Sequence, residues 1–244
     1  MRVRPIQAVL AAVCCAIALP VCAGSFEVNP VRLNLSASAR TSSLTVKNTG
    51  TDTVVVQTNV VAWSQQQGKD VYSPTNDILV TPPIVTIAPG AEQIVRAGLR
   101  RAPDPTSELA YRVYLQEAPP PPKPGFQGLQ VALRVGLPLF VEPVHGPARA
   151  ALSWTLLHQG NTLRLDLHNE GNGHIQIGEV QLFPTGSNKP IATQSTLAYV
   201  LPGQSRSWEF KIEADQATAI GKRLRLKAAT DMGSVETELA FTTP

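Results

Sequence analysis

The chain has 244 residues, with 21 basic and 18 acidic side chains and a formal net charge of +3. A charge this small argues against a nucleic-acid-binding protein, which needs a strongly basic face. About 220 residues remain when the first 23 are left out, and this length suits two domains of ordinary size.

The N-terminus has the three parts of a secretory signal peptide. Arg2 and Arg4 supply positive charge, residues 8–19 form an apolar stretch too short to span a bilayer, and small residues precede a cleavage point after Ala23. We therefore expect residues 1–23 to be removed on export. Lipidation at Cys22 is the alternative, which the preceding Val21 disfavours.

Cleavage would remove every cysteine of the chain, since Cys14, Cys15 and Cys22 all lie in the leader. A mature chain without thiols has no disulfide, no thiol nucleophile and no thiolate metal site. The 21 basic residues fall to 19 when Arg2 and Arg4 are lost, against 18 acidic ones. We expect no membrane-spanning segment in the mature chain, because no later stretch is long and apolar enough.

Apolar residues alternate with a period of two through the first half of the mature chain, as in half-buried strands. The expected strands lie in VNPVRLNLS, SSLTVKN, VVVQTNVVAW, DILVTPPIVTIAPG, EQIVRAGL and ELAYRVYLQE. Short strands separated by turns indicate an immunoglobulin-like sandwich. Pro82 and Pro83 would interrupt a central strand, so they predict an edge or a strand that switches sheets.

The next strand, GFQGLQVALRVGLPLFVEP at residues 125–143, follows the proline-rich run APPPPKPG. Large apolar residues occupy every second position of this strand: Leu129, Val131, Leu133, Val135 and Leu137. The pattern alone favours a face that fills the protein's own core. A face held open for another chain is the alternative.

The second half contains seven more alternating segments, from ARAALSWTLLHQ to SVETELAFTT. Prolines and a glycine cluster in VEPVHGPAR between the two sets. We therefore predict an all-β protein with two immunoglobulin-like β-sandwich domains in tandem, over residues 24–143 and 144–244.

Signs of catalytic chemistry are missing from the sequence. The serines lack a GxSxG elbow, the glycines form no phosphate-binding loop, and the four histidines show no ligand spacing. We expect no catalytic residues, no metal and no cofactor, and hence no enzyme.

Two strand arginines are candidates for an anion site. Arg32 points away from the apolar face of VNPVRLNL, and Arg112 lies between Tyr111 and Val113. A guanidinium among apolar neighbours is costly to bury alone, and its fork fits a carboxylate. A side chain that reaches solvent or a nearby carboxylate is an equally good interpretation.

The order of these features resembles the PapD-like periplasmic pilus chaperones. The resemblance rests on VNPVRLNLS, TPPIVTIAPGAEQIVR, YRVYLQEAPPPP and LQVALRVGLPLFVEP in the first half, and on LHNEGNGHIQIGEV, YVLPGQSRSWEF and AATDMGSVE in the second. It covers essentially the whole mature chain. The form GLPLFVEP is similar to the archaic branch, which serves spore-coat-U-like subunits.

The resemblance implies a periplasmic chaperone that lends a strand to incomplete pilus subunits and delivers them to an outer-membrane usher. Alternate side chains of the lent strand would fill the subunit's groove. The implied donor residues are Leu129, Val131, Leu133 and Val135. An exposed apolar edge would also favour self-association of the free chaperone.

The resemblance also implies an anchor for the subunit's C-terminal carboxylate. Arg32 matches the family's arginine, but the position of its lysine holds Pro138. Arg112 is the expected replacement, and Arg134 is a weaker one. Near the hinge, Glu142 replaces an arginine whose acidic partner would be Asp231, so that interdomain ion pair is not expected here.

Two other classes stay open on the sequence alone. A structural pilus subunit would carry an N-terminal donor extension, whereas this chain enters its first strand soon after Gly24. A secreted carbohydrate-binding sandwich would need an aromatic platform, and aromatic residues make up only 5% of the chain.

Overall fold

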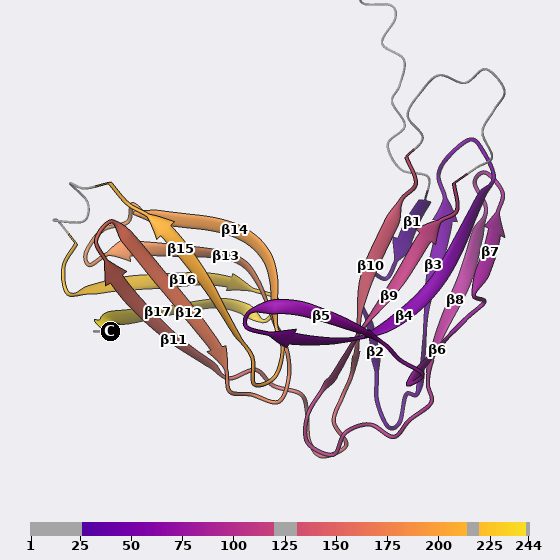
Figure 1. The fold of residues 1–244 in the computed structure, drawn as a ribbon, viewed down its shortest axis with the longest axis horizontal. Helices are drawn as coiled ribbons and strands as arrows, with labels where there is room; N and C mark the ends of the chain where they lie inside the picture. The colour runs from indigo at the N-terminus through magenta and orange to yellow at the C-terminus, as the bar shows by residue number, and fades with distance from the viewer. Residues whose placement is uncertain (1–25, 120–130, 214–219, 243–244) are drawn as a thin grey trace, which may run out of the picture.

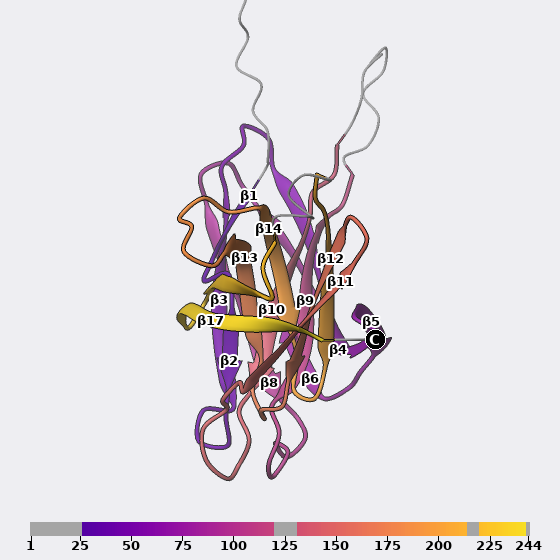
Figure 2. The ribbon, with the colours of Figure 1, turned by 90° about the vertical axis from the view of Figure 1, so that its left-hand side faces the viewer.

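The computed structural model describes residues 26–119, 131–213 and 220–242. The described residues form 17 strands, β1 to β17, in two lobes that are set at an angle to each other (Figures 1 and 2). No helix in these ranges is long and apolar enough to span a membrane. The expected signal peptide, residues 1–23, and the donor candidate Leu129 lie outside the described residues.

The first lobe has two facing sheets. One has the order β1-β3-β8-β6, formed by Phe26–Asn29, Thr41–Asn48, Glu92–Leu99 and Ile78–Thr81. The other has the order β2-β10-β9-β4-β5, formed by Leu33–Leu35, Arg134–Val141, Leu109–Glu117, Val54–Gln66 and Lys69–Pro74. The short strand β7, Ile84–Ile87, pairs with β4.

The period-two pattern places one face of each strand in the core between these sheets. Val46 and Val113 are fully buried, while their neighbours Lys47 and Arg112 lie outside the core. Because side chains alternate across a strand, this one pattern fixes which face of each sheet is buried.

Pro82 and Pro83 mark the place where the chain changes sheets. β6 ends at Thr81 and pairs with β8, whereas β7 begins at Ile84 and pairs with β4 in the opposite sheet. Where the chain enters the second sheet, the Pro83 carbonyl accepts a 2.8 Å hydrogen bond from the amide of Thr58 on β4. The predicted strand switch is therefore confirmed.

The second lobe contains seven strands in the order β14-β13-β16-β17-β11-β12-β15. They are formed by Ala192–Val200, Ile175–Pro184, Arg223–Thr230, Gly233–Thr242, Leu152–Gln159, Thr162–Asn169 and Ser205–Lys211. The expected alternation in Leu163, Leu165 and Leu167 buries all three side chains completely.

A small apolar cluster joins the two lobes. Trp63, Ala110 and Phe140 of the first lobe pack there against Leu201 of the second, with Tyr199 at the edge. The amide of Gln65, only 5% exposed, completes the contact. It donates to the Tyr199 carbonyl at 2.8 Å and accepts from the amide of Leu201 at 3.0 Å.

Glycine is required in the NEGNG turn that faces the first lobe. A Cβ on Gly171 would stand 2.6 Å from the amide nitrogen of Ala151 and closer still to the Arg149 carbonyl. Gly171→Ala is expected to lower the free energy of unfolding of the second lobe by about 1–3 kcal/mol, since main chain must shift to admit the methyl group.

Urea unfolding followed by tryptophan fluorescence measures this cost. Gly221→Ala is the matched control, because nothing lies within 4 Å of a Cβ built there and its φ lies outside the left-handed region. Equal stability of the two variants would contradict the close packing of the turn.

Candidate functional site

One edge of β10 is only partly covered. β9 pairs with all of Arg134–Val141, whereas β2 pairs on the other side only with Leu139, Phe140 and Val141. In the described part of the chain, no strand pairs with Arg134–Pro138 on that second side. We call this stretch the open edge; it lies in the upper part of β10 in Figure 1.

The direction of the backbone groups follows from the hydrogen bonds at either end of β10. The Leu133 carbonyl accepts from the amide of Glu117 on β9, and the amide of Glu142 donates to Leu35 of β2. Because successive residues of an antiparallel pair alternate in direction, Arg134 and Gly136 present their N–H and C=O groups to the open edge. Pro138, which has no N–H, also faces this edge, where proline is tolerated.

The apolar row of this strand is divided between two environments. Leu137, Leu139 and Val141 are buried in the core of the first lobe. Leu133 and Val135 are partly buried against that core, and Val131 is 76% exposed. The core-filling interpretation therefore holds for the C-terminal half of the strand, and exposure increases toward its N-terminal end.

Arg112 lies beside the end of the open edge. It is the register partner of Pro138, and its Nη1 donates to the Gly136 carbonyl at 3.3 Å. Its guanidinium lies 4.2 Å from the centre of the Trp63 ring, while its Nε is buried with no hydrogen-bond partner among the described residues. Burial raises the pKa of the neighbouring Tyr72, and the positive charge of Arg112 opposes that shift.

The weaker candidate, Arg134, is directed elsewhere. Its guanidinium stacks 4.1 Å from the centre of the Tyr114 ring, which lies over Gly136. A Cβ on Gly136 would stand 2.8 Å from Cε1 of that ring. Because Gly136 has no Cβ, the Tyr114 ring can pack against the backbone beside the open edge.

Arg32 immediately precedes β2 and reaches into the second lobe. Its Nη1 donates to Oδ2 of Asp231 at 3.0 Å, and its Nη2 donates to Oε1 of Gln176 at 3.0 Å and to the Tyr199 hydroxyl at 3.3 Å. Burial alone would lower the pKa of Arg32, but the hydrogen bonds and charges of Tyr199 and Asp231 raise it overall.

The two predicted anchors therefore lie near one another. The guanidinium carbons of Arg32 and Arg112 are 5.8 and 5.6 Å from the centre of the same Tyr199 ring. The strand register places Arg112 directly beside Pro138, and the residue after Arg32 pairs with the residue after Pro138. Two positive charges thus flank the position where the family's lysine is replaced.

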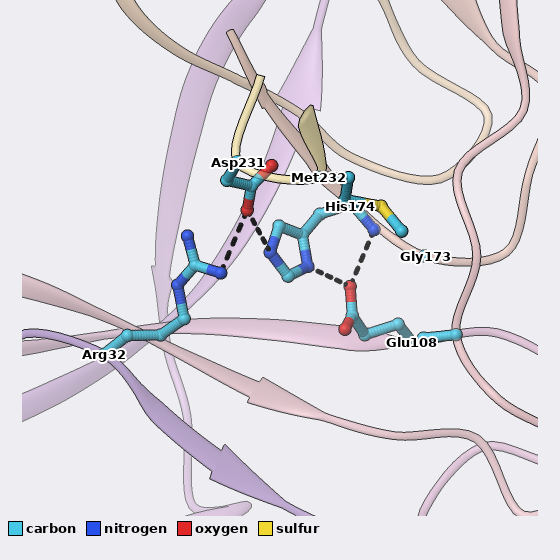
Figure 3. A pocket seen from close by; sticks show the side chains of 7 residues that line it. Arg32, Glu108, Gly173, His174, Asp231 and Met232 are labelled. Carbon is cyan, nitrogen blue, oxygen red and sulfur yellow. Dashed lines mark hydrogen bonds and ion pairs between the residues drawn. The ribbon is translucent and has the colours of Figure 1, made fainter. Parts of the chain in front are cut away.

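A pocket of about 180 Å³ opens beside Arg32 between the lobes (Figure 3). His174 lines it between Glu108 and Asp231, with Nδ1 2.7 Å from Glu108 Oε2 and Nε2 3.9 Å from Asp231 Oδ2. The His174 ring also stacks on Phe140, with the ring centres 3.5 Å apart. A chain of polar contacts thus runs from Arg32 of the first lobe through Asp231 and His174 of the second to Glu108 of the first.

Asp231 pairs with Arg32 and not with residue 142, the position at which the family resemblance implies an arginine. Glu142, which replaces that arginine, is exposed and makes no ion pair within the described ranges, whereas Asp231 pairs with Arg32. The expected loss of the family's ion pair is compatible with this geometry, but the new partner of Asp231 was not predicted.

Several residues of this region had no signal in the sequence. Gln65, Gln176, Tyr199 and the Glu108–His174 pair act through contacts between distant segments. Within the described residues, no group of three histidine, cysteine or acidic side chains is arranged to hold a metal ion.

Comparisons with known proteins place the fold. The family model described as pili and flagellar-assembly chaperone, PapD N-terminal domain, matches residues 25–146. No curated protein sequence gave a significant match.

Three solved structures illustrate the likeness in fold. A chain of the CsuC–CsuE chaperone–tip adhesion subunit pre-assembly complex, from archaic chaperone-usher Csu pili of Acinetobacter baumannii, has a TM-score of 0.64 and 22% identity, over 90% of this chain and 100% of that one. A chain of the Salmonella enterica complex of SafA pilin with the SafB chaperone has a TM-score of 0.62 and 19% identity, over 91% of this chain and 99% of that one. The E. coli chaperone DraB has a TM-score of 0.58 and 22% identity, over 89% of this chain and 98% of that one.

At these identities the solved structures establish the two-sandwich fold, and the family model covers half of the chain. The protein thus belongs to the family of PapD-like pilus chaperones.

Proposed function

We propose that the mature protein is a periplasmic chaperone that binds pilus subunits by lending them β10, and that delivers them to an outer-membrane usher. The observation that carries this proposal is the open edge at Arg134–Pro138, which continues into the exposed Val131. An unpaired strand edge beside alternate apolar side chains is what β-strand addition uses.

The geometry favours one direction for the incoming strand. The open edge ends where β2 begins, and Arg32 and Arg112 stand at that end. A strand parallel to β10 would bring its C-terminus there, and an antiparallel strand its N-terminus. Two guanidinium groups favour a carboxylate over an ammonium, so we propose parallel pairing with Arg32 and Arg112 as the carboxylate anchor.

The apolar row is expected to supply most of the affinity. Leu129, Val131, Leu133 and Val135 are the proposed donor residues. An exposed side chain such as Val131 contributes roughly 1.5–3 kcal/mol when it is fully buried, before ordering costs, and the partly buried Leu133 and Val135 contribute less. An exposed charge pair contributes about 0–1 kcal/mol. The anchor therefore chiefly sets the register of the bound strand.

The solved relatives support this assignment of partners. The CsuC–CsuE and SafA–SafB structures are complexes of a chaperone with a tip subunit or a pilin. We further propose cleavage after Ala23, a domain boundary near residue 144, and membership of the archaic branch. The likeness to the Csu complex supports the last of these.

Capture of subunits from the host periplasm tests the proposal. The tagged mature protein is expected to recover a small secreted subunit, identified by mass spectrometry. Arg32→Ala and Arg112→Ala are each expected to recover less of it, because the bound strand loses part of the anchor that sets its register. Arg164→Ala is the matched control, because it removes an exposed arginine that pairs with Asp166 far from the open edge.

Absence of any sandwich-type partner, in cells that are making surface fibres, would overturn the proposed function. Recovery that is equal with both anchor variants would keep the chaperone but remove the anchor.

A further inference from the structure

Arg32 already holds a carboxylate in the free chain, and that carboxylate belongs to Asp231 of the other lobe. We propose that Asp231 is an internal competitor: it occupies Arg32 until a subunit's terminal carboxylate takes its place. This inference rests on the proposed function, because it concerns the ligand of the same anchor.

The two carboxylates would use the same donors. Arg32 donates through Nη1 to Asp231 and through Nη2 to the neutral oxygens of Gln176 and Tyr199. Within the described ranges, Asp231 is therefore the only charged acceptor of this fork. The pair is partly open to solvent, with side-chain exposures of 31% for Arg32 and 19% for Asp231, so a second carboxylate can approach it.

Asp231 keeps other partners when Arg32 turns away. Its Oδ1 accepts a 2.9 Å hydrogen bond from the amide of Gln176, and its Oδ2 lies 3.9 Å from Nε2 of His174. Exchange therefore does not leave its charge buried alone, which would make the step prohibitive.

Arg112 shows the opposite situation. In the described part of the chain it makes no ion pair, its Nη1 donates to the neutral Gly136 carbonyl, and its buried Nε has no hydrogen-bond partner. An arriving carboxylate meets no internal rival at Arg112. It therefore binds there first and then draws Arg32 away from Asp231.

The exchange would link subunit binding to the contact between the lobes. Arg32 belongs to the first lobe and Asp231 to the second, so a carboxylate that takes Arg32 removes one interlobe ion pair. Coupling of this kind is reciprocal: the factor by which a bound carboxylate weakens the ion pair is the factor by which the ion pair weakens carboxylate binding.

The test uses a defined probe, an acetylated seven-residue peptide that alternates valine and threonine and ends in phenylalanine, made as the free acid and as the amide. Binding to wild type and to Asp231→Asn is measured by NMR titration. Asparagine retains an oxygen for the amide of Gln176 but loses the charge. We expect Asp231→Asn to bind the acid at least about fivefold more tightly than wild type does, with no change for the amide.

Asp166→Asn is the control, because it removes the same charge from another arginine pair of the second lobe. Thermal unfolding of each variant checks that the fold is retained. An acid affinity that is unchanged or lowered in Asp231→Asn would overturn the proposal, and a lowered one would make Asp231 a positioning residue for Arg32. If wild type still captures subunits in that case, only the competition fails; if capture fails as well, the proposed function fails with it.

Discussion

Replacing Val131 with aspartate is expected to abolish subunit binding while the fold stays intact. Val131 is 76% exposed, so the change should alter the free energy of unfolding by less than about 0.5 kcal/mol. Its loss from a subunit groove would remove roughly 1.5–3 kcal/mol, and burial of a carboxylate there adds a further cost. Affinity for the subunit should therefore fall by more than about 100-fold.

Co-purification and titration with the captured subunit measure this effect. Ala132→Asp is the matched control, since it adds the same charge at an exposed neighbouring position on the opposite face of the strand. Leu137→Asp places the same charge at a buried position of the row. Leu137 is 4% exposed, so this replacement should unfold the first lobe. Equal binding by Val131→Asp and Ala132→Asp would contradict the proposed donor row.

Replacing Phe140 with alanine should strongly destabilise the protein. Phe140 is 1% exposed and belongs to the cluster that joins the lobes. Its ring stacks on His174 and contacts Trp63 and Tyr199, with ring centres 6.0 and 5.9 Å away. We expect a loss of about 3–5 kcal/mol, as for other buried phenylalanines.

Removal of the Phe140 ring should also make the two lobes unfold at different urea concentrations. Amide signals of each lobe, followed by NMR during urea titration, resolve the two transitions without replacing Trp63, which itself belongs to the joining cluster. Phe210→Ala is the control, because Phe210 lies in the core of the second lobe away from the joining cluster. Midpoints that stay coincident in Phe140→Ala would show that this cluster does not couple the lobes.

The period of the apolar residues was enough to predict most of the fold. A strand buried on one face needs apolar side chains at every second position, and that demand is local. The strand switch at Pro82 and Pro83 could be predicted for a similar reason, because proline removes a hydrogen bond that a central strand requires.

The candidate site was less accessible to sequence reasoning. Arg32 and Asp231 are 199 positions apart, and no local pattern brings them together. The division of the apolar row between core and open edge depends on where β2 joins β10, which periodicity does not encode. Gln65 and Tyr199 likewise act through pairings between lobes.

The central claim is that a subunit strand pairs with the open edge of β10, and amide hydrogen exchange tests it most directly. The amides of Arg134 and Gly136 face this edge, whereas those of Val135 and Leu137 face β9. Exchange would be followed by NMR in the free chaperone and in the purified chaperone–subunit complex. We predict strong new protection at Arg134 and Gly136 and little change at Val135 and Leu137. A complex in which Arg134 and Gly136 exchange as fast as in the free protein would contradict strand addition at this edge.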